Sequence, residues 1–280
     1  MNAIEIYNLS KTYDNFHLDN INLTLPGGCI MGLIGENGAG KSTIIKLILD
    51  IIERDSGTIN VLGRDNRDKF ALTKEDIGVV LDDLGIPEYL TVKEVNRLMR
   101  YTYANWNESV FYYLLNKFSI PADKRLKKLS KGTKMKLGLA VALSHGAKLL
   151  ILDEATNGLD PVVKDEVMEI FFNFTRSENH SILISSHIIS DLEKICDYIA
   201  FLHKGKLLLC EEKDILKSQY GIIRCTAEFL KTLPPYAVKG ARISPYGAEG
   251  IVLRSFIPQE IPVYPIDLEQ LFVFIIKGVN

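Results

Sequence analysis

The sequence lacks the features that mark membrane-spanning and secreted chains. Its 280 residues contain no run of about 18 consecutive apolar residues, which is the length a helix needs to cross a bilayer. The most apolar stretch, residues 137–147, is 11 residues long and includes Ser144 and His145. Residues 1–11 carry Glu5 and no apolar core of the kind found in signal peptides. We therefore expect a chain that does not cross a membrane by itself.

The sequence also lacks a charge excess and a cysteine framework. Its 33 Lys and Arg residues nearly balance 35 Asp and Glu residues, giving a net charge of −2, so nothing in the overall charge favours nucleic acid or an anionic membrane as a partner. Cys29, Cys196, Cys210 and Cys225 form no C-x-x-C pair and accompany no metal-like cluster. We expect reduced, mostly buried thiols in a cytosolic protein.

The remaining composition is that of a globular protein with a substantial core. The chain is 47% hydrophobic and 24% charged, which excludes a disordered or fibrous chain. At this length a protein buries roughly three quarters of its unfolded surface. The size suits one large domain with an appendage, or two domains.

Alternating patterns predict a mixed α/β chain. Strands are expected at residues 3–9, 20–25, 29–34 and 58–62, and helices at 41–52, 134–144, 161–176 and 267–277. The short apolar runs 149–152 and 181–184 are typical of buried parallel strands. Residues 91–145 are rich in Leu, Tyr and Lys and show no convincing strand, which predicts an inserted helical subdomain. After residue 211, prolines punctuate short β-like pieces.

A glycine-rich segment follows the third predicted strand directly and precedes a helix. It fits the pattern G-x-x-x-x-G-K-[ST] with Gly35, Glu36, Asn37, Gly38, Ala39, Gly40, Lys41, Ser42 and Thr43. Such glycines let backbone N–H groups point at phosphate oxygens, and the helix N-terminus adds a favourable field. In this pattern Lys41 reaches the β and γ phosphates and the Ser42 hydroxyl is a ligand for Mg²⁺. The alternative is a glycine turn with a chance Lys-Ser pair, which the strand–loop–helix setting disfavours.

Two acidic residues end the apolar run at residues 149–152. Asp153 and Glu154 then lie at the carboxyl end of a buried strand, where open α/β sheets bind ligands. Asp153 can hold Mg²⁺ through water, and Glu154 can accept a proton from an attacking water. The alternative is a strand that ends in a solvated acidic turn.

These two motifs and four further ones occur in the order found in one family. Residues 129–133 (LSKGT) occupy the place of its L-S-G-G-Q signature, residues 158–160 resemble its D-loop, and His187 its switch histidine. Tyr13, 28 residues before Lys41, stands where the family has an aromatic residue that stacks on adenine. Over residues 1 to about 210 the chain resembles the nucleotide-binding subunit of an ATP-binding cassette (ABC) transporter, of the single-cassette bacterial exporter type.

The resemblance implies roles for these residues. A second copy, arranged head to tail, would close the site with its signature, so that Ser130, Gly132 and Asp160 contact nucleotide. His187 would contact the γ-phosphate and the attacking water. From the residues alone, Ser130 is predicted to be the N-cap of a basic surface helix, and a histidine such as His187 is more often a satisfied core or surface residue. Tyr13 is equally well a packing residue, with Phe16 and His17 as alternatives beside it.

Pattern and resemblance together define the expected fold. It is an α/β fold with a P-loop nucleoside-triphosphatase core, an N-terminal antiparallel β subdomain, an inserted α-helical subdomain and a small C-terminal α+β region. Residues 1–210 would form the ATPase domain, with its helical subdomain at about 88–147. Residues 211–280 would form an accessory region for dimer or partner contacts.

The sequence departs from the family pattern at two places. Asp82 stands where a Q-loop glutamine normally contacts Mg²⁺ and couples the site to the membrane partner, so Asp82 is either a metal contact or a spectator. In the signature, Lys131 replaces the first glycine and Thr133 the glutamine. Lys131 would add a cation near the ATP of the second copy.

The expected function is hydrolysis of ATP, with Mg²⁺, by a subunit that powers a separate transmembrane permease, in export. Glu154, His187 and Lys41 would be the catalytic residues. The chain would be cytoplasmic, peripheral on the inner face of the cell membrane, and active as a homodimer or heterodimer of nucleotide-binding subunits, with no nucleic acid partner. The alternatives are a soluble cassette that acts on ribosomes or nucleic acid, a hydrolysis-impaired regulatory subunit, and a P-loop kinase or GTPase.

Overall fold

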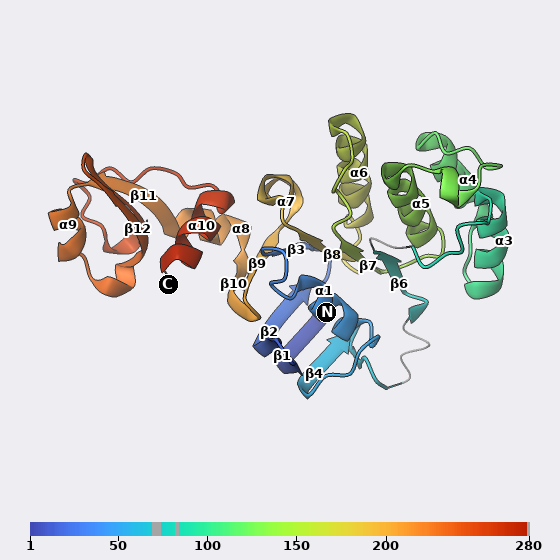
Figure 1. Ribbon diagram of the computed structural model, residues 1–280, viewed down its shortest axis with the longest axis horizontal. Helices are drawn as coiled ribbons and strands as arrows, with labels where there is room; N and C mark the ends of the chain where they lie inside the picture. The colour runs from blue at the N-terminus through green and yellow to red at the C-terminus, as the bar shows by residue number, and fades with distance from the viewer. Residues whose placement is uncertain (69–73, 82–83, 279–280) are drawn as a thin grey trace.

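The chain folds around three sheets with helices packed between and beside them (Figure 1). The structure is a computed structural model that describes residues 1–68, 74–81 and 84–278. The N-terminal sheet lies below the central sheet in the view, helices α3 to α5 lie at one end, and the C-terminal sheet lies at the other. The expected combination of an α/β core, an N-terminal antiparallel sheet, a helical insertion and a small C-terminal α+β region is confirmed.

The central sheet has six strands in the order β10-β9-β3-β8-β7-β6. The strands are β3 (Ile30–Ile34), β6 (Ile77–Val80), β7 (Leu149–Asp153), β8 (Ser181–Ser186), β9 (Tyr198–His203) and β10 (Lys206–Glu212). All neighbours are parallel except β9 and β10. The prediction of buried parallel strands at β7 and β8 is confirmed, whereas β6, β9 and β10 were not predicted.

Side chains of the central sheet alternate between two apolar clusters, as the two-residue period of a strand requires. On β7, Leu149 and Ile151 face the N-terminal sheet, and Leu150 and Leu152 face the helices on the other side. Because both faces of β3, β7, β8 and β9 are buried, these strands are apolar almost throughout, and their polar side chains are confined to the strand ends.

The N-terminal sheet has the order β2-β1-β4-β5 and is antiparallel. It consists of β1 (Asn2–Tyr13), β2 (Phe16–Pro26), β4 (Ser56–Val61) and β5 (Arg64–Asp65). Helix α1 (Lys41–Ile48) packs between this sheet and the central one. The expected helix over 41–52 was too long, because Asp50 takes a φ of 50° and the Asn66 amide donates hydrogen bonds to the carbonyls of Leu47 and Ile48.

The helical insertion consists of α3 (Val92–Thr102), α4 (Glu108–Lys117), a short 3₁₀ turn (Leu126–Lys128) and α5 (Lys131–Leu143). Thr91 and Glu94 form a reciprocal capping box at the start of α3. The helix expected at 134–144 begins three residues earlier, because the Ser130 hydroxyl accepts a hydrogen bond from the backbone N–H of Thr133 and so caps α5 at Ser130.

Two helices cover the face of the central sheet opposite α1. They are α6 (Pro161–Phe174), which is capped by Asp160, and α7 (Ile189–Ile195) (Figure 1). The helix expected at 161–176 therefore starts where predicted and ends two residues earlier, at Phe174.

The C-terminal region is built on a three-stranded antiparallel sheet in the order β11-β13-β12. Its elements are α8 (Lys213–Gln219), β11 (Tyr220–Cys225), α9 (Ala227–Thr232), β12 (Val238–Ser244), β13 (Gly247–Leu253), α10 (Leu268–Gly278) and 3₁₀ turns at Pro235–Ala237 and Arg254–Phe256. Helix α10 packs against both β12 and α7, and Phe272 meets Phe201 of β9 edge to face at 5.0 Å. The closing helix expected at 267–277 is found at Leu268–Gly278, and it packs this region against the core.

Within the described residues, none of the helices combines the length and the apolar character that a bilayer crossing requires. All four cysteines are free thiols. Of these, Cys196 is buried, but Cys29, Cys210 and Cys225 are only partly buried, so the expectation of mostly buried thiols was wrong for these three.

Candidate functional site

The glycine-rich loop leaves β3 and turns directly into α1. Gly40 takes a φ of 112°, and a Cβ added there would lie 2.8 Å from Cζ of Phe16. At Gly35 an added Cβ would lie 2.5 Å from the carbonyl oxygen of Leu202. These two positions therefore need glycine, one for its backbone conformation and one for close packing. The loop is further held by the turn after β9, where the Gly205 N–H donates to the carbonyl of Ala39 at 3.0 Å.

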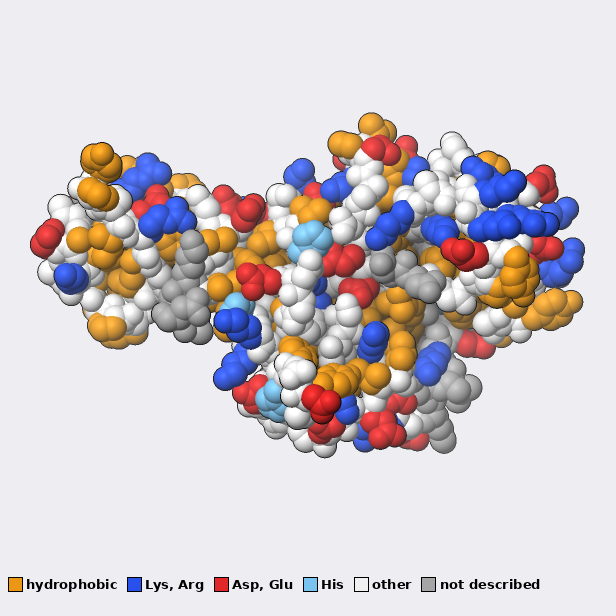
Figure 2. Space-filling view, in the orientation of Figure 1, with side chains coloured by type: hydrophobic (Ala, Val, Ile, Leu, Met, Phe, Trp, Pro, Cys, Tyr) orange, Lys and Arg blue, Asp and Glu red, His pale blue; other side chains and the backbone are white. Residues whose placement is uncertain are grey.

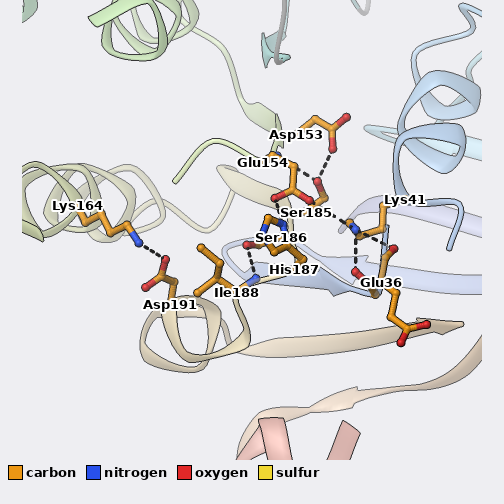
Figure 3. Close-up of polar contacts among 11 residues, drawn as sticks. Glu36, Lys41, Asp153, Glu154, Lys164, Ser185, Ser186, His187, Ile188 and Asp191 are labelled. Carbon is orange, nitrogen blue, oxygen red and sulfur yellow. Dashed lines mark hydrogen bonds and ion pairs between the residues drawn. The ribbon is translucent and has the colours of Figure 1, made fainter. Parts of the chain in front are cut away.

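Lys41 is a buried cation at the start of α1, with 6% of its side chain exposed. Its Nζ donates to the carbonyls of Gly35 at 2.7 Å and Glu36 at 3.2 Å, and lies 3.5 Å from Oε1 of Glu154 (Figure 3). A buried ammonium group needs such partners, because its desolvation is costly. The loop thus holds the amine between its own carbonyls and the acidic end of β7.

The acidic pair at the end of β7 is positioned by the neighbouring strand β8. The Ser185 hydroxyl donates to the Asp153 carboxylate and accepts a hydrogen bond from the Glu154 N–H at 3.2 Å (Figure 3). Glu154 has a φ of 55°, a conformation that is strained for a residue with a Cβ, and its N–H also bonds to the Ser185 carbonyl at 3.1 Å. The two bonds from one N–H hold this strained residue at the mouth of the sheet.

His187 follows β8 and contacts the same carboxylate. Its Nδ1 lies 2.9 Å from Oε2 of Glu154 (Figure 3). Because an ionised carboxylate only accepts hydrogen bonds, Nδ1 carries the proton in this contact. Glu154 therefore bridges Lys41 and His187, with one carboxylate oxygen directed to each.

A cavity of about 740 Å³ gathers these groups. Most of the residues that line it were predicted from the sequence: Tyr13, Asn37, Gly38, Gly40, Lys41, Ser42, Thr43, Asp153, Glu154 and His187. Phe16, considered as an alternative to Tyr13, lines it as well, and so does Lys131 of the signature segment. Asn15 and Asn157 were not predicted. Asp82 lies outside the described residues.

The other predicted nucleotide contacts do not line this cavity. Gly35, Glu36 and Ala39 belong to the loop itself but are absent from the wall. Ser130, Gly132 and Asp160 are likewise absent from it. Within one chain Ser130 caps α5, and Asp160 caps α6 by accepting a hydrogen bond from the Val163 N–H at 3.0 Å. The N-cap interpretation of Ser130 is therefore correct for the single chain.

Two aromatic residues stand at the end of the cavity nearest the N-terminal sheet. Tyr13 and Phe16 are opposite each other in the register of β1 and β2. Tyr13 is 44% exposed, and Nζ of Lys11 lies 5.6 Å from its ring centroid. His17, the remaining alternative, points elsewhere, since it contacts Thr12 and Asp19.

The donor set fits Mg²⁺ with bound phosphates. The Ser42 hydroxyl and the Asp153 carboxylate line the same cavity, and both are oxygen ligands. Among the described residues, His, Cys, Asp and Glu side chains form no group of three or more that would make an all-protein metal site. Mg²⁺ commonly takes one or two protein oxygens and completes its shell with phosphate and water, so the pair is adequate.

Ser185 is a site residue that sequence reasoning missed. It directly follows the run 181–184, which was predicted as a buried parallel strand, and neighbouring parallel strands end at the same edge of a sheet. A signal was therefore present in the sequence, but only the contact with Asp153 shows that this serine, rather than Ser186, supports the acidic pair. Ser186 instead accepts a hydrogen bond from the Ile188 N–H at the start of α7.

Comparison with known proteins decides the family. A model of the family described as ABC transporter matches residues 18–157. The lantibiotic transport ATP-binding protein SrtF of Streptococcus pyogenes is 41% identical over 216 residues, which cover 75% of this chain and 91% of that protein. The chain belongs to the ABC transporter family. The ABC transporter ATP-binding protein YtrB of Bacillus subtilis (strain 168) is 34% identical over 286 residues, covering 96% of this cassette chain and 97% of YtrB.

Solved structures agree with this assignment. An ATP binding subunit of an ABC transporter has a TM-score of 0.70 at 28% identity, covering 78% of this chain and 92% of that one. The dimeric cassette MJ0796 shows the same fold, with a TM-score of 0.68 at 20% identity over 75% of this chain and 98% of that one. The chain is thus an ATP-binding cassette subunit, an ATPase that powers a transport system.

Proposed function

We propose that this cassette binds ATP in the cavity above β3, β7 and β8 and hydrolyses it to drive export through a separate transmembrane permease. The observation that carries the proposal is the convergence of Lys41, Glu154 and His187, with Asp153 beside them, in one cavity at the carboxyl ends of parallel strands. Similarity to proteins named for the transport of lantibiotics and bacitracin supports export.

Binding begins with the loop and its lysine. Gly38, Gly40, Lys41, Ser42 and Thr43 line the cavity at the N-terminus of α1, and a glycine-rich loop in this setting favours a polyphosphate. We propose that the β and γ phosphates take Lys41 Nζ from its present partners, the loop carbonyls and Glu154. Bound Mg²⁺ would neutralise phosphate charge, and Ser42 and Asp153 are the residues that would hold it.

Loss of the Lys41 contact prepares Glu154 for catalysis. An ion pair with a cation favours the charged carboxylate and occupies it, whereas a freed carboxylate can accept a proton from water. His187 keeps Glu154 oriented through the 2.9 Å contact with Nδ1. We propose Glu154 as the general base, Lys41 as the phosphate-neutralising cation and His187 as the group that positions base and γ-phosphate.

The remaining predicted contacts require a second copy. Ser130, Gly132 and Asp160 do not line the cavity of their own chain, so they contact nucleotide only if another cassette presents them. We propose a head-to-tail homodimer or heterodimer, and a dimeric cassette of the same fold supports the arrangement. Tyr13, with Phe16 opposite it, is proposed to stack on adenine.

The proposed domain limits and location follow the same scheme. Residues 1–210 form the ATPase unit, although β10 continues to Glu212, and residues 211–280 form an accessory unit that contacts partners. The cassette would be peripheral on the inner face of the membrane, held there by its permease through the helical insertion. No nucleic acid partner is proposed, since positive and negative residues nearly balance.

Phosphate release tests the function directly. The chain is purified with its permease in lipid vesicles, and hydrolysis is compared with that of Glu154→Gln, which is isosteric but a poor base. We expect Glu154→Gln to retain ATP binding and to lose hydrolysis by about 10²–10⁴-fold. If the native complex binds ATP but releases no more phosphate than Glu154→Gln, hydrolysis by this site is wrong.

A further inference from the structure

An ion pair joins the two helices that begin beside the site. Nζ of Lys164 on α6 lies 2.6 Å from Oδ2 of Asp191 on α7 (Figure 3). The two side chains are only 20% and 12% exposed, so water and salt screen this pair less than an ion pair on the surface. Neither residue lines the nucleotide cavity, so the pair does not contact the substrate itself.

The ion pair lies in the first turn of each helix. Asp191 stands four positions after His187, and Ile188 lies between these two residues in the close-up view (Figure 3). Lys164 is held just after the cap of α6, because its N–H donates to the carbonyl of Asp160 at 2.9 Å. The pair therefore fixes where α7 begins relative to the start of α6.

The position of His187 depends on where α7 begins. Its side chain is exposed, and its described polar contact is the 2.9 Å contact of Nδ1 with Glu154. In the space-filling view, histidine and acidic side chains are exposed together over the central sheet (Figure 2). The backbone before His187 is fixed in β8, which pairs with both β3 and β7. The backbone after it leads directly into α7, so α7 sets the other end of this short segment.

Apolar packing alone does not define the start of α7 as closely as the ion pair does. Ile189, Leu192 and Ile195 are buried in the core, but apolar burial is non-directional. The contact between Lys164 and Asp191 requires one distance between two atoms. Loss of either partner leaves the other charge poorly compensated in a largely buried place, which favours movement of α7 toward water.

We propose that Lys164 and Asp191 are positioning residues for hydrolysis, whose ion pair fixes the start of α7 and thereby holds His187 at Glu154. This inference rests on the proposed function, in which Glu154 activates water and His187 orients it. Desolvation offsets much of the attraction in such a pair, so stability alone explains it poorly. A displacement of about 1 Å in a reacting geometry can cost about 10²-fold in rate, so a small shift of His187 is enough to slow hydrolysis.

The first test separates the rate of hydrolysis from ATP binding. Phosphate release by the complex with permease in lipid vesicles gives kcat and KM, and calorimetry on the purified chain gives the affinity for ATP. We expect Lys164→Met and Asp191→Asn each to lower kcat by about tenfold, with KM and affinity within about twofold of the native values. Lys164→Arg keeps the cation and should retain kcat within about twofold. Weaker ATP binding by Lys164→Met would overturn the inference.

The second test asks whether the ion pair acts through His187. His187→Ala should itself lower kcat by about tenfold or more, and adding Lys164→Met should then cost no more than about a further twofold. A merely structural role of the pair would lower kcat by the same factor in both backgrounds. That proportional loss would overturn the inference.

Lys148→Met is the matched control, because it also removes a lysine from an ion pair, with Asp76 at 3.1 Å, at the end of β7 opposite Asp153. It should retain the native kcat, and an equal loss in Lys148→Met and Lys164→Met would overturn the positioning role. Circular dichroism at the assay temperature follows the fold, and Asp191→Asn repeats the comparison with almost no change in volume.

Failure of the proposed function gives a different result from failure of this inference. A native complex that hydrolyses ATP no faster than Glu154→Gln would overturn the function and the positioning role together. A normal native rate that Lys164→Met and Asp191→Asn leave unchanged would overturn the positioning role alone.

Discussion

The central sheet and the C-terminal sheet differ in where their polar and exposed side chains lie. In the central sheet the parallel strands β7 and β8 are buried on both faces, and Asp153 and Ser185 lie at the edge where these strands end. In the C-terminal sheet β12 is exposed over most of its length, with Ile243 60% exposed, and Tyr246 in the turn that follows β12 is 100% exposed. The parallel sheet places its reactive side chains together at one edge, whereas the antiparallel hairpin exposes large apolar and aromatic side chains to solvent.

The two sheets are joined mainly through one helix of the core. Helix α7 follows the loop that carries His187, and its Glu193 accepts from Nζ of Lys217 in α8 at 2.6 Å and from the Leu268 N–H of α10 at 3.3 Å. On the other side Phe272 of α10 meets Phe201 of β9. The C-terminal region therefore rests on elements next to the site while contributing no residue to the cavity wall. Changes in the two regions should have separable consequences.

The largest difference is expected for the buried lysine of the loop. Lys41→Ala removes the cation proposed to neutralise phosphate charge, so ATP hydrolysis by the complex with permease should fall by about 10²–10³-fold or more. Lys217→Ala in α8 removes a cation from the C-terminal region and should leave the hydrolysis rate within about twofold. Phosphate release at saturating ATP measures both. Comparable losses in the two variants would show that catalysis is not confined to the central sheet.

The second largest effect concerns the stability of the protein. It distinguishes the buried core of the central sheet from the contact between α10 and that core. Phe201 is fully buried in the central sheet, whereas Phe272 on α10 is 7% exposed. Phe201→Ala should lower the free energy of unfolding by about 3–5 kcal/mol, through lost burial and the cavity that remains. Phe272→Leu keeps most of the apolar volume and should cost about 1.5 kcal/mol or less. Urea unfolding followed by circular dichroism gives both values, and a larger loss for Phe272→Leu would contradict the comparison.

The fold of the core was predictable because its signals are local. The loop at residues 35–43 combines glycine spacing, a preceding strand and a following helix in one continuous segment, and the structure has each of them. Glu154 was predicted because its strand is apolar and ends in acids. The supporting hydroxyl of Ser185 was not, because it belongs to another strand and its role depends on the register between β7 and β8.

Non-local contacts also explain the missed elements. Strand β6 has four residues, one of them Gly78, so its pattern alone is too short to assign. At Gly78 an added Cβ would lie 2.6 Å from Cδ2 of Leu150, which shows that tight packing on β7 requires the glycine. In the C-terminal region, Gly240 of β12 similarly lets the backbone of Phe274 approach. Such close approaches depend on how distant segments pack together, so they can be recognised in the folded structure but not in the sequence.

A smaller effect is expected where α7 contacts α8 and α10. Glu193→Ala removes the acceptor for Lys217 and for the Leu268 N–H, and partial solvent exposure limits the loss to roughly 1 kcal/mol. Hydrogen exchange should increase in residues 268–276, and the amides of β7 and β8 should stay protected. Glu249→Ala, which removes a surface ion pair with Arg224, is the control and should leave α10 unchanged. Faster exchange in β8 would mean that the contacts of α7 with α8 and α10 also stabilise the nucleotide site.

The smallest perturbation uses the thiols as probes and leaves the fold intact. Burial raises the pKa of Cys196, the fully buried thiol at the end of α7, far above its ordinary value, and raises the pKa of Cys210 to about 11. Burial also raises the pKa of Cys225 in β11, which is only partly buried. Because the thiolate is the reactive form, all three should react slowly at neutral pH, and labelling of a thiol that the reagent can reach should accelerate as pH rises toward its pKa.

Access to reagent then separates the two sheets. Cys225 should be modified by a thiol reagent such as DTNB in the native protein, faster at pH 9 than at pH 7, whereas Cys196 should require unfolding at either pH. Mass spectrometry of the digested protein assigns each label. Native labelling of Cys196 at a rate near that of Cys225 would show that α7 opens from the central sheet as readily as the C-terminal sheet exposes its surface. The helix after His187 would then share the dynamics of the appendage rather than those of the core.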